Sequence, residues 1–365
     1  AGGRGRPPLQ RAAILLASAL IATLVIIWAA YGFHRGPDRP LRNVVEDWYA
    51  TQSLLPQYPD GPPDIELRRA RATTRIGFAG KTLLRVKEWG VLPESYLFGL
   101  ATIRRSSLVR ESFLRGQFSS TGFASYFFWT FFYKTTIPAL CAIALALFTA
   151  RKTKSRALPF LLWPVVIYLA ISVQSSLNIG HRHVLPVVPF LYVLAGSLAT
   201  RWSERRTAVL IALAAVASVI VILPKPAPVW GRHLSYMNEF AGGPRRGYEK
   251  LLDSNFDWGQ ELPRLAAWLR EHHIDEPVNL VYSSMAEPRA YGIAYRNMVF
   301  GYWAEPALPV DQTKIPGYLA IDVSRLQGLG IVPEERNTWK RFLADHGAKE
   351  VGRAGYSMLI YRIER

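Results

Sequence analysis

The stretch AAILLASALIATLVIIWAAYGF, residues 12–33, contains no charged side chain. The stretch TAVLIALAAVASVIVIL, residues 207–223, is uncharged as well. A helical run of about 18 or more apolar residues is long enough to cross the hydrocarbon core of a bilayer. We therefore expect an integral membrane protein rather than a wholly soluble one.

Five membrane-spanning helices are predicted, at about residues 12–33, 127–150, 157–175, 184–200 and 207–223. A signal peptide is the alternative for the first, because Arg4, Arg6 and Arg11 precede it. Its apolar core is longer than that of a signal peptide and ends in Trp28 and Tyr31, aromatic residues typical of a membrane interface. The predicted fold class is an α-helical integral membrane bundle of about five transmembrane helices with a C-terminal extracytoplasmic α/β domain.

The 365-residue chain has 44 Lys and Arg against 27 Asp and Glu, a formal net charge of +17. Residues 226–365 contain 17 basic and 17 acidic side chains, so the whole excess lies in residues 1–225, among the apolar segments. A nucleic-acid-binding protein would gather such charge on one surface, whereas membrane proteins carry it in their cytoplasmic loops. We expect no nucleic-acid partner.

The short-loop charges predict the orientation in the membrane. The tail 1–11 is basic, loop 151–156 carries +4 and loop 201–206 carries +2, which places all three in the cytoplasm. Residues 34–126 and 224–365 are then extracytoplasmic. Within the first, KTLLRVKEWGVLPESYLFGL (81–100) alternates basic with apolar residues, which fits either an amphipathic helix in the membrane interface or a soluble cap.

Residues 224–365 have the composition of a small globular domain. Helices are predicted at 260–272 and 334–346, and strands at 278–283, 317–323 and 356–362. Alternating helices and strands indicate an α/β domain.

The stretch from Asn178 to Pro189, NIGHRHVLPVVP, is the most informative for function. Arg182 offers a planar, permanently charged fork of donors that suits a lipid phosphate, with His181 and His183 beside it. The alternative is an arginine that anchors the chain at the headgroups, with two solvated histidines. Two histidines without a nearby Cys or carboxylate do not predict a metal site. Pro186 and Pro189 predict an irregular start to the next helix.

Two further groups of polar residues are weaker candidates. Asp253, Asn255 and Asp257 resemble the start of a calcium loop, but the residues that should complete it are absent. Two interpretations of these three residues remain: a loop that binds the acceptor, or an Asx-turn that leads into a helix. Glu46 and Asp47 could act as an outward-facing general base, or belong to a solvated loop.

Several of these stretches resemble bacterial protein O-mannosyltransferase-like membrane enzymes, the GT-C class of polyprenyl-phosphate-sugar-dependent glycosyltransferases. The matching stretches are WAAYGF (28–33), LPESYLFGL (92–100), SSTGFASYFFWTFFYKTTIP (119–138), GHRHVLPVVPFLYVLAG (180–196), LSYMNEFAGGPRRGY (234–248), LDSNFDWGQEL (252–262) and GYSMLIYRI (355–363). Within them, Arg182 and His183 resemble the family's Arg-aromatic-x-Leu-Pro signature, although His183 stands where Tyr is frequent.

The resemblance implies a multi-pass enzyme of the bacterial inner membrane that transfers a sugar from a polyprenyl-phosphate carrier to an extracytoplasmic acceptor. It also implies that this chain, which begins at Ala1, is a C-terminal portion whose catalytic Asp lies upstream, in an N-terminal half or another membrane subunit. Arg182, with His181 and His183, would bind the carrier phosphate. The alternative function is a catalytically inactive scaffold subunit of a larger membrane complex.

Overall fold

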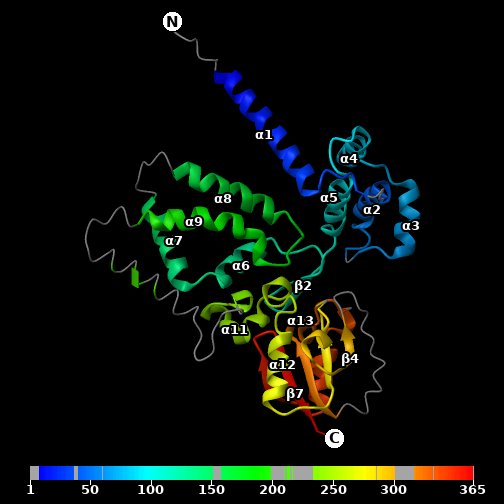
Figure 1. Ribbon diagram of the computed structural model, residues 1–365, viewed down its shortest axis with the longest axis vertical. Coiled ribbons are helices and arrows are strands. Elements are labelled where there is room, and N and C mark those ends of the chain that lie inside the picture. The colour runs from blue at the N-terminus through cyan, green and yellow to red at the C-terminus, as the bar shows by residue number, and fades with distance from the viewer. Residues whose placement is uncertain are drawn as a thin grey trace. The chain divides into compact units, whose positions relative to one another are not determined.

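The computed structural model describes residues 8–36, 40–59, 61–150, 158–198, 209, 212–213, 216, 233–284, 286–300, 316–331 and 333–364. The chain divides into two compact units, residues 1–110 and 111–365. Figure 1 draws the first in blue to cyan and the second from cyan-green to red. The boundary falls inside the segment 34–126, which was predicted to be a single loop.

The first unit is helical. Its elements are α1 (Pro8–Ala30), α2 (Leu41–Leu54), α3 (Asp64–Thr73), α4 (Phe78–Trp89) and α5 (Glu94–Ser106). Leu41 and Val45 of α2 pack with Leu97 and Ala101 of α5 to form a small apolar core, which the inner face of α4 covers. The predicted amphipathic segment 81–100 is therefore two helices, separated at Gly90, which has a φ of 63° that favours glycine.

The second unit begins with a hairpin and a group of apolar helices. The elements are β1 (Ser112–Leu114), β2 (Gln117–Ser119), α6 (Tyr126–Lys134), α7 (Ile137–Ala150), α8 (Leu158–Val173), η1 (His181–Val187) and α9 (Val188–Gly196). Helix α9 packs against both α7 and α8 (Figure 1). As Pro186 and Pro189 predicted, α9 starts irregularly, because the preceding turn η1 is a 3₁₀ helix.

The predicted five-span bundle is wrong for the described residues. They contain one unbroken helix that is long and apolar enough to cross a membrane, Ala12–Ala30, or two if the bent pair α6 and α7 is counted as one span. Helices α6 and α7 meet at 118°, because Thr135 is extended and Pro138 has no N–H to continue the helix.

The remaining predicted spans also differ from the structure. Helix α8 has only 16 residues, and the segment predicted at 184–200 contains a 3₁₀ turn followed by the nine-residue helix α9. Most of the segment predicted at 207–223 lies outside the described residues. Within the described residues, hydropathy alone therefore predicted more spans than the helices provide.

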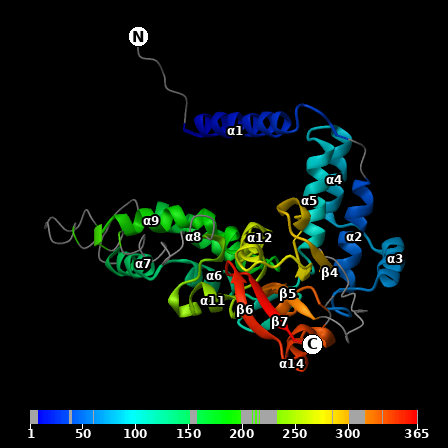
Figure 2. The ribbon, with the colours of Figure 1, turned by 60° about the horizontal axis from the view of Figure 1, so that its bottom comes forward.

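A five-stranded mixed sheet follows, in the order β4-β3-β5-β7-β6. Its elements are α12 (Leu262–Glu271), β3 (Val278–Tyr282), η7 (Pro288–Tyr291), β4 (Tyr295–Phe300), β5 (Gly317–Asp322), α13 (Val323–Gln327), η8 (Pro333–Glu335), α14 (Thr338–Asp345), β6 (Lys349–Ala354) and β7 (Met358–Ile363). Strands β4, β3 and β5 are parallel, whereas β7 is antiparallel to both β5 and β6 (Figure 2). The three predicted strands and two predicted helices are confirmed.

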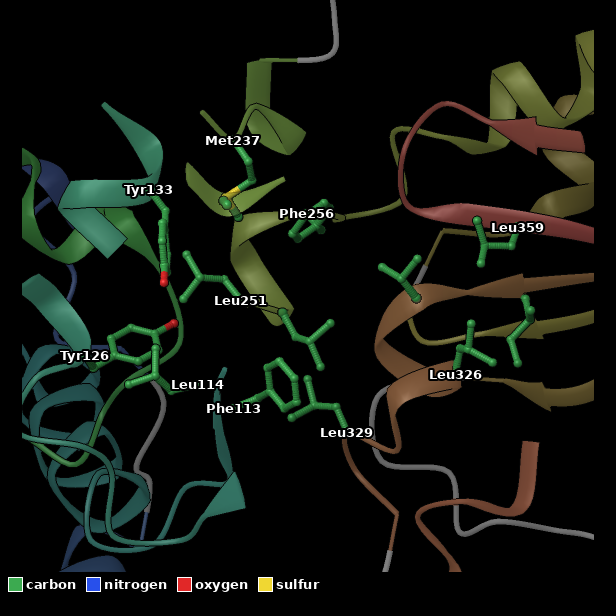
Figure 3. Close-up of a cluster of buried hydrophobic side chains, with 14 of the residues drawn as sticks. Phe113, Leu114, Tyr126, Tyr133, Met237, Leu251, Phe256, Leu326, Leu329 and Leu359 are labelled. Carbon is green, nitrogen blue, oxygen red and sulfur yellow. The ribbon is translucent and has the colours of Figure 1, made fainter. Parts of the chain in front are cut away.

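Short turns connect the apolar helices to this sheet. They are η3 (His233–Ser235), η4 (Glu239–Ala241), α11 (Gly243–Arg246), η5 (Gly247–Glu249) and η6 (Asp253–Asn255). Leu251 and Phe256 of this segment lie between Tyr126 and Tyr133 of α6 on one side and Leu326 and Leu359 of the sheet domain on the other (Figure 3). One hydrophobic core is thus shared by α6, the turns and the sheet.

The end of α6 is held by a buried amide. The Nδ2 atom of Asn238 donates to the carbonyl oxygens of Phe132 (2.6 Å) and Thr135 (2.9 Å). Carbonyls in the last turn of a helix have no partner within the helix, so Asn238 supplies the bonds that permit the sharp bend into α7.

We predict that Asn238→Ala lowers the free energy of unfolding by about 2–4 kcal/mol, because it leaves two buried carbonyls without a donor. Denaturant unfolding of the full chain in detergent measures this loss. Asn337→Ala is the matched control, since Asn337 is exposed and its side chain caps nothing. Equal stability of the two variants would contradict the role of Asn238.

Candidate functional site

The structure brings together two stretches that the sequence separates by about 70 residues. The backbone N–H of His181 donates to Oδ1 of Asn255 at 3.0 Å. A Cβ added at Gly180 would lie 2.9 Å from Cβ of Ser254, so the two backbones approach closely there. The turn η1, which carries Arg182, therefore lies against the turn η6.

Asn255 is the centre of this contact. Its side chain is 1% exposed, and its Nδ2 donates to Tyr126 Oη at 3.0 Å and to the Leu252 carbonyl at 2.9 Å. With the bond accepted from His181, the amide joins α6, η1 and η6. Asn255 thus has a structural role that requires both amide atoms.

Lys134 contacts the turn η6 from the interior of the unit. It was not among the functional residues predicted from the sequence. Its Nζ donates to the Asn255 carbonyl at 2.5 Å and to the Leu234 carbonyl. The sequence offered one signal that Lys134 has a special role: it is the single charged residue in the aromatic stretch YFFWTFFYK.

The two histidines are held in the neutral form at pH 7. Burial, and then the charge of Lys134, lower the pKa of His181 to about 4. Burial and Arg182 lower the pKa of His183, and Asp253 opposes this shift. The buried Nδ1 of His181 and Nε2 of His183 have no hydrogen-bond partner within the described residues. Both atoms are buried, so each is an unsatisfied polar group among the described residues.

Arg182 is exposed. Its guanidinium lies 5.2 Å from the centre of the Trp258 ring, and no ion pair to Arg182 occurs in the described part of the chain. An arginine that stacks on an aromatic ring keeps its fork of donors available for an oxyanion.

The two aspartates of the DSNFD stretch have different surroundings. Oδ1 of Asp253 accepts from the N–H (2.6 Å) and Oγ (2.8 Å) of Ser254, and its φ of 58° is unusual for a residue other than glycine. Asp257 turns toward the sheet domain, where it accepts from Ser357 Oγ at 2.6 Å and from Gly259 N–H at 2.6 Å. Of the three polar residues predicted in this stretch, Asn255 and Asp253 therefore lie near η1, whereas Asp257 does not.

Glu46 and Asp47 lie in the other compact unit. Asp47 is 7% exposed and forms ion pairs with Arg71 and, at 3.8 Å, with Arg105. Glu46 pairs with Arg42 at 3.9 Å. Asp47 therefore joins α2 to α3 and α5, which is a structural role rather than that of an accessible base.

In the ranges that the structure describes, no three His, Cys, Asp or Glu side chains are grouped so that they could hold a metal ion.

Comparisons with family models, with curated proteins and with solved structures find no match to this chain. The resemblance to polyprenyl-phosphate-dependent glycosyltransferases therefore remains a prediction from the sequence.

Asp257 provides a test of these electrostatics, because burial raises its pKa from 3.8 to about 7. The folded chain then retains a proton that the unfolded chain releases near pH 4, so this group costs stability as the pH rises from about 4 to about 7. We predict that Asp257→Asn becomes progressively more stable relative to the wild type over this range. Urea unfolding at several pH values measures the difference.

The comparison isolates Asp257, since His181 and the other titrating groups are common to both chains. Asp275→Asn is the control, because Asp275 is exposed. A stability difference for Asp257→Asn that does not change with pH would contradict the raised pKa.

Proposed function

We propose that this protein transfers a sugar from a polyprenyl-phosphate carrier to an extracytoplasmic acceptor in the bacterial inner membrane, and that Arg182 binds the phosphate of the carrier. The observation that carries the proposal is the state of Arg182, which is exposed, stacked on Trp258 and without an ion pair among the described residues. A cation left in this state is ready to bind an anionic ligand.

The chemistry of sugar transfer explains the need for such a cation. The bond between the anomeric carbon and the phosphate oxygen breaks as an acceptor oxygen attacks, and the lipid phosphate leaves with the bonding electrons. The hydroxyl proton of the acceptor passes to a general base, for which the resemblance implies an Asp upstream of this chain. A fixed donor at the departing oxygen lowers the barrier because it needs no rearrangement. Asn255 fixes the turn that carries Arg182 through its bond to His181.

Exposed apolar side chains support a lipid-linked donor. Phe160 and Trp163 of α8 are 78% and 62% exposed, and Ile167 and Ile171 continue the apolar surface along the same helix. A soluble protein seldom leaves large apolar patches of this kind in water. The surface is suited to apolar chains, either the acyl chains of the bilayer or the isoprenoid chain of the carrier.

Arg182→Ala in the complete protein is expected to slow sugar transfer about a hundredfold, the usual effect of removing one donor to a developing oxyanion. Arg182→Lys should recover part of the rate, since it restores the charge but not the fork. The measurement is transfer of radiolabelled sugar from polyprenyl-phosphate-sugar in native membranes.

Arg270→Ala is the matched control, because Arg270 is an exposed arginine on α12. Binding of polyprenyl phosphate in detergent micelles gives a second measurement, in which Arg182→Ala alone should bind less. If the Arg182→Ala variant transferred sugar at the wild-type rate, the proposal would be wrong. If the complete wild-type protein had no transferase activity, the result would favour a scaffold subunit.

A further inference from the structure

Helix α4 has one packed face and one bare face. Leu83 and Leu84 pack into the core of the first unit, and Gly80 is buried where a Cβ would meet Val45 and Tyr49. The opposite face carries Phe78, Lys81, Thr82, Arg85, Glu88 and Trp89, all of them exposed.

Two large aromatic side chains mark the ends of this bare face. Phe78 is 86% exposed and Trp89 is 70% exposed. They are 11 residues apart, which corresponds to three turns and places them on one stripe, about 16 Å from each other along the helix axis. Between them on the same stripe lies Arg85, with Lys81 beside it. Glu88 is the one exposed acidic residue of the helix.

The same compact unit contains the candidate membrane span, and the end of that span is fixed next to α4. Trp28 of α1 donates from Nε1 to the Val91 carbonyl at 3.0 Å, two residues after α4 ends. The rings of Tyr31 and Tyr96 meet edge to face at 6.2 Å. Trp and Tyr at the end of a spanning helix mark the headgroup level of a bilayer, so Trp89 lies close to that level.

We propose that α4 docks on an anionic lipid surface at the end of α1, with Phe78 and Trp89 inserted among the headgroups and Lys81 and Arg85 in contact with lipid phosphates. An aromatic residue at each end and cations between them are the features of a helix that lies in the interface plane. Lipid phosphate is the partner that complements these cations. This inference is independent of sugar transfer, since it uses no residue of the second unit.

Spin labels measure the depth of this helix in the full-length chain. The native cysteine, Cys141, is exposed and is first replaced by Ala. A single cysteine is then placed at Phe78, at Trp89 or, as the control, at Ile65 of α3, which is also an exposed apolar residue in the same unit. The labelled chains are reconstituted into vesicles of phosphatidylcholine mixed with phosphatidylglycerol.

Labels at positions 78 and 89 should collide more with oxygen, which concentrates in lipid, and less with a water-soluble nickel chelate than the label at position 65. Collision ratios at positions 78 and 89 that equal the ratio at position 65 would overturn the proposal. Protection from both reagents would overturn it too, because it would mean that another protein covers this face.

Charge reversal at Arg85 tests the proposed contact between the cations of α4 and lipid phosphates. Arg85→Glu should lower the ratio of docked to undocked label by at least about fivefold, the effect of one lost cation at an anionic surface, and only when phosphatidylglycerol is present. Arg68→Glu is the control, since Arg68 is an exposed arginine on α3. Equal effects of the two reversals would contradict a specific role for α4.

Discussion

The side chain of Asn255 organises the second unit, because its amide holds together three segments that are far apart in the sequence. It accepts from the His181 N–H and donates to Tyr126 and to its own turn. A buried amide must have its bonds satisfied, since an unsatisfied one costs more free energy than the net gain from making the bond. The position of η1, and of Arg182 on it, follows from that requirement.

The same contact determines where positive charge resides. Lys134 bonds to the carbonyl of Asn255. Burial, and to a smaller extent the charge of Lys134, lowers the pKa of His181 and keeps it neutral. Positive charge near η1 therefore belongs to Arg182 on the exposed side and to Lys134 on the inner side. A ligand phosphate that approached Arg182 would meet the charge of its guanidinium, and the neutral imidazoles beside it would add none.

The C-terminal domain was predicted from sequence because its helices and strands follow local periodicity. Leu262, Leu265 and Leu269 form one apolar face of α12 and are all buried. The apolar region was predicted to be helical, but its division into short helices was not, because hydropathy averages over the features that end a helix. Pro138 and the bonds from Asn238 break the segment 127–150. One proline hardly lowers the mean hydropathy of such a segment, and Asn238 lies outside it. The contact between residues 181 and 255 is equally invisible, since it depends on long-range packing.

The shared hydrophobic core has a consequence for how this protein can evolve. Leu251 and Phe256 contact the apolar helices and the sheet at once (Figure 3). A sheet domain that is cut away at residue 233 would expose one side of that core to water. The α/β domain is therefore not a separate module that recombination can move onto an unrelated set of helices, and substitutions in α6 and in the sheet must compensate each other.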